Sequence, residues 1–143
     1  AERLVFPYLT NLEYAQDSVV RPFLPISIGL EGSVADSLAL LDTGSDLNVI
    51  PFSLGIRLGA DWAQHQPEHK LNGLTESLEA KSLILDVTVG DWPTIRMPFA
   101  WAETNAIPVI LGQSPFFLHF NVCFMRAQRE FELELRRPRQ SDL

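Results

Sequence analysis

Short hydrophobic runs separated by turn-forming residues occupy most of the chain from residue 22 onward. Residues 82–89 show the pattern clearly, because apolar side chains recur at every second position, which is typical of a β-strand with one buried face. Glycine, proline, asparagine or aspartate ends most of the runs, as in short strands joined by turns. The other predicted strands span residues 23–30, 34–41, 48–51, 95–102, 108–112, 121–125 and 130–135.

Helical signals are few. Residues 52–58 are predicted to form a helical turn that ends at Gly59. Residues 113–120 could form one or two turns of helix, although Pro115 lies within them. The stretch 61–69 is polar and irregular, so we predict a loop there.

The order of these segments predicts one all-β domain over residues 22–135, built as a barrel or a sandwich. Residues 1–21 are predicted to be an extended lead-in that could contain one short strand. Residues 136–143 are predicted to be a polar tail. Within the domain, Asn72-Gly73 is the strongest hairpin signal, because this pair favours a tight two-residue turn between strands.

Composition supports a single domain with its own hydrophobic core. The chain has 143 residues, of which 46% are hydrophobic and 20% are charged. Its one cysteine, Cys123, lies in an apolar stretch and is predicted to be buried. A single cysteine excludes an internal disulfide and favours a reducing, cytoplasmic setting, although the compartment stays undetermined.

Net charge and hydropathy restrict the classes of molecule that the chain is expected to bind. A net charge of −7 argues against nucleic acid, and the basic cluster at residues 136–139 is predicted to be solvated. No apolar run approaches the roughly 20 residues that span a bilayer, so we expect no membrane contact from this segment and leave an anchor outside it open. His65 and His69 are four residues apart, but Pro67 lies between them and no third ligand is evident. We therefore predict no metal site, and packing roles for Trp62, Trp92 and Trp101.

The motif with the clearest chemistry is Asp42-Thr43-Gly44-Ser45, which follows the apolar strand that ends at Leu41. A strand that runs into this sequence places a carboxylate on a tight turn, and Gly44 allows a second backbone to approach closely. The same four residues could also form an ordinary surface turn. A second element lies downstream, where two large apolar residues precede a glycine in Ile110-Leu111-Gly112.

With these two elements in this order, the sequence resembles the retropepsin-like aspartic proteases, the family of the retroviral proteases and their cellular and bacterial relatives. The resemblance covers residues 23–135. It implies a closed barrel with a flap hairpin near Asn72 and Gly73, one short C-terminal helix, and a homodimer. By the same resemblance, Asp42, Thr43 and Gly44 form the catalytic triplet, and the substrate-binding residues are Leu40, Ser45, Asp46, Val49, Asn72, Gly73 and Ile110.

Some of these assignments have a plain alternative. Asp46 could be a charged turn residue, and Leu40, Val49 and Ile110 could simply belong to the core. Gln113 departs from the retroviral pattern, which has an arginine there that pairs with the equivalent of Asp46. Ser45 also departs from it, because alanine is usual at that position. A Ser45 hydroxyl could donate to a catalytic carboxylate, which would favour an acidic pH optimum.

The chain contains one Asp-Thr-Gly and no second Asp-Ser/Thr-Gly triplet. Because the resembled mechanism needs two carboxylates, it implies a homodimer that pairs Asp42 of both copies and cleaves an extended peptide without metal or cofactor. A different class of function is a weakly active or inactive domain that serves as a peptide-binding or dimerisation module. A third possibility is an unrelated β-barrel with a chance Asp-Thr-Gly.

Overall fold

The computed structural model describes residues 2–10, 19–65, 67–72 and 77–136, and only the backbone of residues 67–72, 77 and 78. Strands dominate it, as predicted. They are β1 (Arg3–Pro7), β2 (Phe23–Leu30), β3 (Ser33–Leu41), β4 (Val49–Ile50), β5 (Pro67–Asn72), β6 (Ser77–Thr88), β7 (Ile95–Ala102), β8 (Val109–Leu111), β9 (Phe120–Met125) and β10 (Glu130–Leu135). The helical segments are α1 (Phe52–Arg57) and three single 3-10 turns, η2 (Trp62–Gln64), η3 (Phe116–Leu118) and η4 (Arg126–Gln128).

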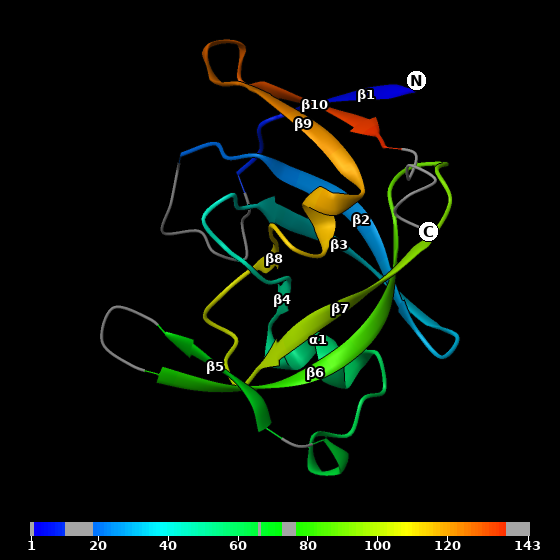
Figure 1. The fold of residues 1–143 in the computed structure, drawn as a ribbon, viewed down its shortest axis with the longest axis vertical. Helices are drawn as coiled ribbons and strands as arrows, with labels where there is room; N and C mark the ends of the chain where they lie inside the picture. Colours follow the sequence, from blue (N-terminus) through cyan, green and yellow to red (C-terminus); the bar gives the residue numbers. More distant parts are fainter. Residues whose placement is uncertain (1, 11–18, 66, 73–76, 137–143) are drawn as a thin grey trace.

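Six strands close into a barrel, in the order β2-β3-β8-β4-β7-β6, and β6 pairs again with β2. Neighbouring strands are mostly antiparallel, but β3 pairs with β8, and β4 with β7, in parallel. β5 continues the sheet beyond β6, so that β5 and β6 form a hairpin at one side of the molecule (Figure 1). The predicted all-β closed barrel with a flap hairpin is therefore confirmed.

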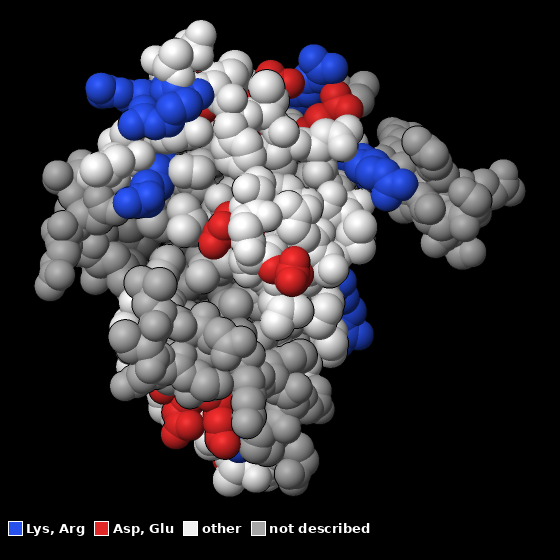
Figure 2. Space-filling model, turned by 60° about the vertical axis from the view of Figure 1, so that its left-hand side comes forward, with Lys and Arg blue, Asp and Glu red and all other residues white. Residues whose placement is uncertain are grey.

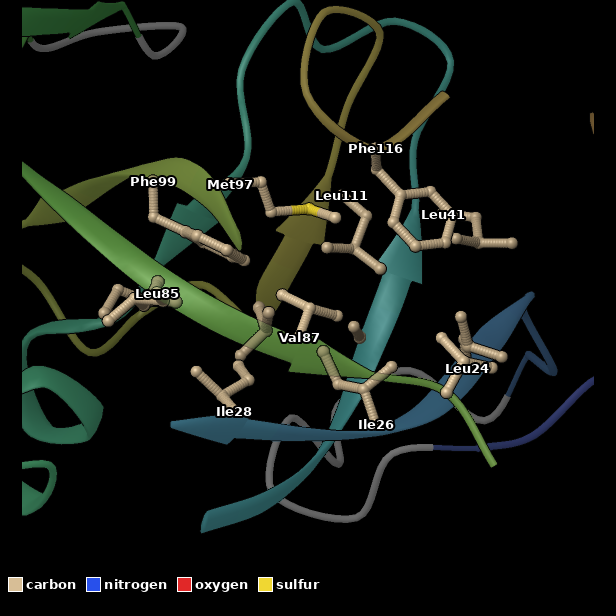
Figure 3. Close-up of a cluster of buried hydrophobic side chains, with 14 of the residues drawn as sticks. Leu24, Ile26, Ile28, Leu41, Leu85, Val87, Met97, Phe99, Leu111 and Phe116 are labelled. Carbon is tan, nitrogen blue, oxygen red and sulfur yellow. The ribbon is translucent and has the colours of Figure 1, made fainter. Parts of the chain in front are cut away.

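One hydrophobic core fills the barrel, because alternate residues of each strand point inward. The four apolar residues predicted to share a face of β6 and its end are all buried, with exposed fractions of 4% or less. Phe116, from η3, is fully buried and closes the core at one end. Figure 3 shows its side chain together with those of Leu24, Ile26, Ile28, Leu41, Leu85, Val87, Met97, Phe99 and Leu111.

Aromatic side chains pack at two further places. Trp101 is fully buried, its ring stacks on Phe52, and its Nε1 donates a hydrogen bond of 3.0 Å to the Phe52 carbonyl. Trp62 meets the Trp101 ring edge-on at 4.9 Å between ring centroids. Trp92 stacks on Phe120 at 5.7 Å. The predicted packing roles of the three tryptophans are thus confirmed.

A second sheet, in the order β1-β10-β9, covers one end of the barrel (Figure 1). The lead-in contributes β1, which is the short strand that the sequence suggested. Phe6 on β1 stacks on Phe131 of β10 at 5.4 Å, and Arg3 donates a 2.8 Å hydrogen bond to Glu134. That hydrogen bond lowers the pKa of the Glu134 carboxyl. The first strand is therefore part of the packed structure.

The segment 113–120 contains one 3-10 turn, which agrees with the predicted one or two turns of helix. Two predictions need correction. Residues 61–69 are not a uniform loop, because they contain η2 and the start of β5. Cys123 is exposed, because it lies on the outer face of the edge strand β9, opposite Glu132. The packing of neighbouring segments decides these outcomes. An apolar stretch alone does not show which face of an edge strand other elements cover.

On the face in Figure 2 the described basic side chains lie near the periphery, and a few acidic ones lie among uncharged residues. No helix among the described residues is long and apolar enough to cross a bilayer.

The packing of Trp101 generates a stability prediction. A Cβ atom at Gly55 would lie 2.8 Å from Cζ2 of Trp101 and closer still to two other atoms of the indole ring. Alanine is the better helix former by about 1 kcal/mol, but overpacking against a locked side chain typically costs about 1–3 kcal/mol. We therefore expect Gly55→Ala to destabilise the fold by about 1–2 kcal/mol in denaturant unfolding.

Gly29→Ala is the matched control, because a Cβ there would lie 3.5 Å from the Ser33 carbonyl oxygen, which is ordinary contact. We expect a change within about 0.5 kcal/mol for the control. Equal unfolding midpoints for Gly55→Ala and Gly29→Ala would show that the indole ring yields to the added methyl group.

Candidate active site

Asp42 stands at the point where β3 leaves the barrel. The parallel pairing of β3 with β8 sets Leu41 beside Leu111, and the Asp42 N–H then donates a hydrogen bond of 3.0 Å to the Leu111 carbonyl. The strand pairing therefore continues one residue beyond β3. This holds the backbone of Asp42 in place while its side chain remains half-exposed.

The turn after Asp42 folds back onto the carboxylate. Oδ1 of Asp42 accepts a hydrogen bond of 2.9 Å from the Gly44 N–H, and the Asp42 carbonyl accepts one of 3.1 Å from the Ser45 N–H. A Cβ atom on Gly44 would approach Oδ1 to 3.3 Å, so glycine suits this close approach. Within the part of the chain that the structure describes, Oδ2 has no hydrogen-bond partner.

The segment that follows β8 lies along this turn. The Gln113 N–H donates a hydrogen bond of 2.8 Å to the Ser45 carbonyl, and the Ser114 N–H donates one of 3.1 Å to the Asp46 carbonyl. Gly112 allows this approach, because a Cβ there would lie 2.6 Å from the Ser45 oxygen and closer still to the Leu47 oxygen. The predicted hydrophobic-hydrophobic-Gly element and the Asp-Thr-Gly turn are therefore in direct contact.

Asn48 is a supporting residue that sequence reasoning missed. Its side chain is fully buried, and its Oδ1 accepts a 2.9 Å hydrogen bond from the Gly112 N–H. Its Nδ2 lies 3.2 Å from the Met97 sulfur, and its own carbonyl accepts from the Ala100 N–H at 2.8 Å. The signal in the sequence was an asparagine as the first residue of the predicted strand 48–51, next to apolar residues, where a buried side-chain amide needs partners.

The three predicted apolar wall residues lie next to one another. Leu40 is level with Ile110 across the β3–β8 pair, and Ile110 is level with Val49 across the β8–β4 pair. Leu40 and Ile110 are half-buried, whereas Val49 is 4% exposed and belongs to a small apolar cluster with alanines of β6 and β7. Leu40 and Ile110 are therefore the members of this group that present apolar surface beside Asp42.

Ser45 and Asp46 differ in how they are held. The Ser45 hydroxyl donates a 2.7 Å hydrogen bond to the Leu47 carbonyl, not to the Asp42 carboxylate. The expectation that Ser45 acidifies the pH optimum through such a bond therefore loses its physical basis. Asp46 is exposed, and its side chain forms no ion pair among the described residues. Gln113, which replaces the retroviral arginine, instead donates from Nε2 to the Thr43 carbonyl at 2.8 Å.

The flap hairpin is described only in part. Asn72 ends β5 and lies opposite Ser77 of β6, whereas Gly73 lies outside the described residues. The described residues contain no group of three side chains able to hold a metal ion. The side chain of His69 is not described.

A cleft in the structure lies apart from the predicted site residues. It has a volume of about 750 Å³, and its lining comes mainly from β2, β3 and α1 and includes Pro25, Asp36 and Arg57. None of the predicted site residues lines it. The predicted site residues and this cleft therefore lie at different places on the chain.

The buried amide of Asn48 generates a second stability prediction. Asn48→Ala leaves the buried Gly112 N–H without its acceptor, which typically costs about 1–3 kcal/mol. We expect a loss of that size in denaturant unfolding. The control is Asn121→Ala, because Asn121 is exposed and makes only a 3.3 Å hydrogen bond to Glu134, so its loss should stay within about 0.5 kcal/mol. Similar losses in both variants would contradict a special role for Asn48.

No protein-family model and no curated protein matches the sequence, but solved structures match the fold. A retropepsin-like aspartic protease from Rickettsia conorii superposes with a TM-score of 0.65 at 12% identity, over 92% of this chain and 98% of that one. EIAV protease complexed with the inhibitor HBY-793 superposes with a TM-score of 0.51 at 24% identity, over 67% of this chain and 85% of that one. The retroviral protease-like domain of Ddi1 from Leishmania major superposes with a TM-score of 0.50 at 16% identity, over 66% of this chain and 74% of that one.

At these identities the likeness concerns the backbone arrangement. It extends over nearly the whole of the Rickettsia protein and includes the barrel described above. The chain has the fold of the retropepsin-like aspartic proteases.

Proposed function

We propose that this protein is an aspartic endopeptidase of the retropepsin type, in which Asp42 of two identical subunits forms the catalytic pair. One observation carries the proposal. The half-exposed carboxylate of Asp42 stands on an Asp-Thr-Gly turn that the Gly112–Ser114 segment holds through backbone hydrogen bonds, in a fold shared with retropepsin-like aspartic proteases.

The chemistry follows from two carboxylates at short range. They cannot both ionise cheaply, so an aspartic dyad keeps one proton between them, as is known for aspartic proteases in general. The ionised member accepts a proton from a water molecule, which attacks the scissile carbonyl carbon. The protonated member donates to the carbonyl oxygen, and the leaving amine takes up a proton as the peptide bond breaks. This reaction needs neither metal nor cofactor.

The geometry of one chain supports a paired site. Oδ2 of Asp42 has no partner among the described residues, and Thr43 and Gly44 beside it are exposed. A two-fold axis next to this turn would bring the same residues of both copies together. The half-site on each subunit would then become one half of a shared groove.

Extended peptides fit this groove best. Leu40 and Ile110 offer apolar surface beside the carboxylate, and the β5–β6 hairpin provides strand backbone with which a substrate could pair. Asn72 and Gly73 are proposed to cover the substrate, and Ser45, Asp46 and Val49 to flank it. The proposed substrate is therefore a stretch of unfolded polypeptide that lies across both subunits.

The proposal predicts the effect of removing the catalytic charge. Asp42→Asn keeps the size of the side chain and its acceptor oxygen for the Gly44 N–H, but a dyad without an ionisable group cannot activate water. We expect cleavage of an unbiased peptide library to fall by at least about 10³-fold with unchanged melting temperature.

Asp91→Asn serves as the control, because it removes an exposed carboxylate between β6 and β7, outside the Asp42 turn and the proposed substrate-binding residues. It should keep substantial activity. Cleavage that persists undiminished in Asp42→Asn would rule out the proposed chemistry. A wild-type protein that binds peptides but cleaves none would instead favour the peptide-binding module.

A further inference from the structure

The Gln113 side chain is held in a specific position, although it lies on the surface. Its Nε2 donates a hydrogen bond of 2.8 Å to the carbonyl oxygen of Thr43, which is the residue directly after Asp42. The backbone N–H of the same residue donates to the Ser45 carbonyl at 2.8 Å. Gln113 therefore binds the turn at two carbonyls, one on each side of Gly44, and we call this pair of contacts the Gln113 clamp.

Among the residues that the structure describes, Gln113 supplies the side-chain hydrogen bond that reaches this part of the turn from outside it. The other side-chain hydrogen bonds described at residues 42–47 start within the turn itself, from the Gly44 N–H and the Ser45 hydroxyl. The Asn48 side chain acts indirectly, because it accepts the hydrogen bond from the Gly112 N–H, one residue before Gln113. Removal of the Gln113 amide would therefore leave the Thr43 peptide group without its side-chain anchor.

We propose that Gln113 is a positioning residue for catalysis, which fixes the Thr43 peptide group and so the direction in which the neighbouring Asp42 carboxylate points. This inference rests on the proposed function. The physical reason is that a reacting group displaced by about 1 Å can lose about 10²-fold in rate, while one exposed hydrogen bond contributes little to folding. The clamp should therefore affect turnover more than stability.

The clamp also differs from an ion pair in its response to pH. An amide donor and a carbonyl acceptor do not titrate, so the contact persists at acidic pH, where a carboxylate partner would be protonated. The Asp46 carboxylate is not needed to hold the turn, which agrees with the lack of an ion pair on its exposed side chain among the described residues.

The substitution Gln113→Glu tests the proposal, because it replaces one NH₂ group by an oxygen in a side chain of the same shape. A protonated carboxyl group can still donate to the Thr43 carbonyl, whereas an ionised one can only accept and repels that oxygen. Asp42 and Asp46 are the acidic residues of the turn that Gln113 contacts, and His119 lies further along its own segment. Nearby like charges raise the pKa of a carboxyl group, so the introduced group should titrate at or above the ordinary value of about 4.3.

We expect the ratio of kcat in this variant to kcat in wild type to be near one at a pH below that titration. The kcat ratio should fall by about tenfold or more as the pH rises through the pKa of the introduced carboxyl group, and KM should change by less than about threefold. Gln113→Arg, which restores a donor, should remain within about threefold of wild type at every pH. The ratio cancels the pH dependence of the catalytic pair itself.

Ser114→Ala is the matched control, because Ser114 is the exposed neighbour and contacts the turn only through its backbone N–H. Its kcat ratio should stay flat with pH. A flat ratio for Gln113→Glu, or an equal loss in Ser114→Ala, would overturn the proposal.

Amide hydrogen exchange separates this inference from the proposed function. At neutral pH the amides of Gly44 and Ser45 should exchange several-fold faster in Gln113→Glu than in wild type or Ser114→Ala. If wild type shows no Asp42-dependent cleavage, the proposed function fails, while faster exchange still establishes the clamp. Unchanged exchange in Gln113→Glu would overturn the clamp whatever the activity.

Discussion

The parallel pairing of β3 with β8 fixes where the Asp42 carboxylate stands. Leu41 pairs with Leu111 at the ends of these strands, and the Asp42 N–H extends the ladder by one hydrogen bond to the Leu111 carbonyl. Everything at the site depends on that register, because the chain that leaves β8 must then lie against the chain that leaves β3. A slip of one residue would turn the Asp42 side chain to the opposite face.

Gly112 and Asn48 make this close approach possible in two different ways. Gly112 removes the side chain that would collide with the carbonyls of Ser45 and Leu47, and Asn48 supplies the acceptor that the Gly112 N–H would otherwise lack. The buried Asn48 amide is satisfied on both sides, so burial of this polar group carries no unpaired atom. A buried polar side chain directly before β4 thus connects the core to the surface turn.

Local pattern predicted most of the strands. The predicted strand at residues 23–30 coincides with β2, and the period-two pattern around Leu85 identified the buried face of β6. The length of β6 was underestimated, because its first residues pair with β5 in the flap hairpin, and the alternating apolar pattern does not extend to them. Cys123 was misassigned for a similar reason, since its exposure depends on which face of β9 is covered.

The candidate site was predictable as a motif but not as a set of contacts. The Asp-Thr-Gly turn and the glycine at residue 112 are visible in the sequence, whereas the bond from Gln113 to the Thr43 carbonyl joins residues 70 positions apart. The substitution of arginine by glutamine at residue 113 signalled that an ion pair was absent, but only the structure identifies what the glutamine holds instead.

If two copies of Asp42 share one active site, an experiment that mixes intact and inactivated subunits should reveal it. Wild type and Asp42→Asn are unfolded together in varying proportions at constant total concentration, refolded, and assayed for peptide cleavage. If every active unit needs two intact carboxylates, activity follows the square of the wild-type fraction, and an equal mixture retains about a quarter of it. Activity that rises in direct proportion to the wild-type fraction would contradict the account, because each subunit would then carry a complete site.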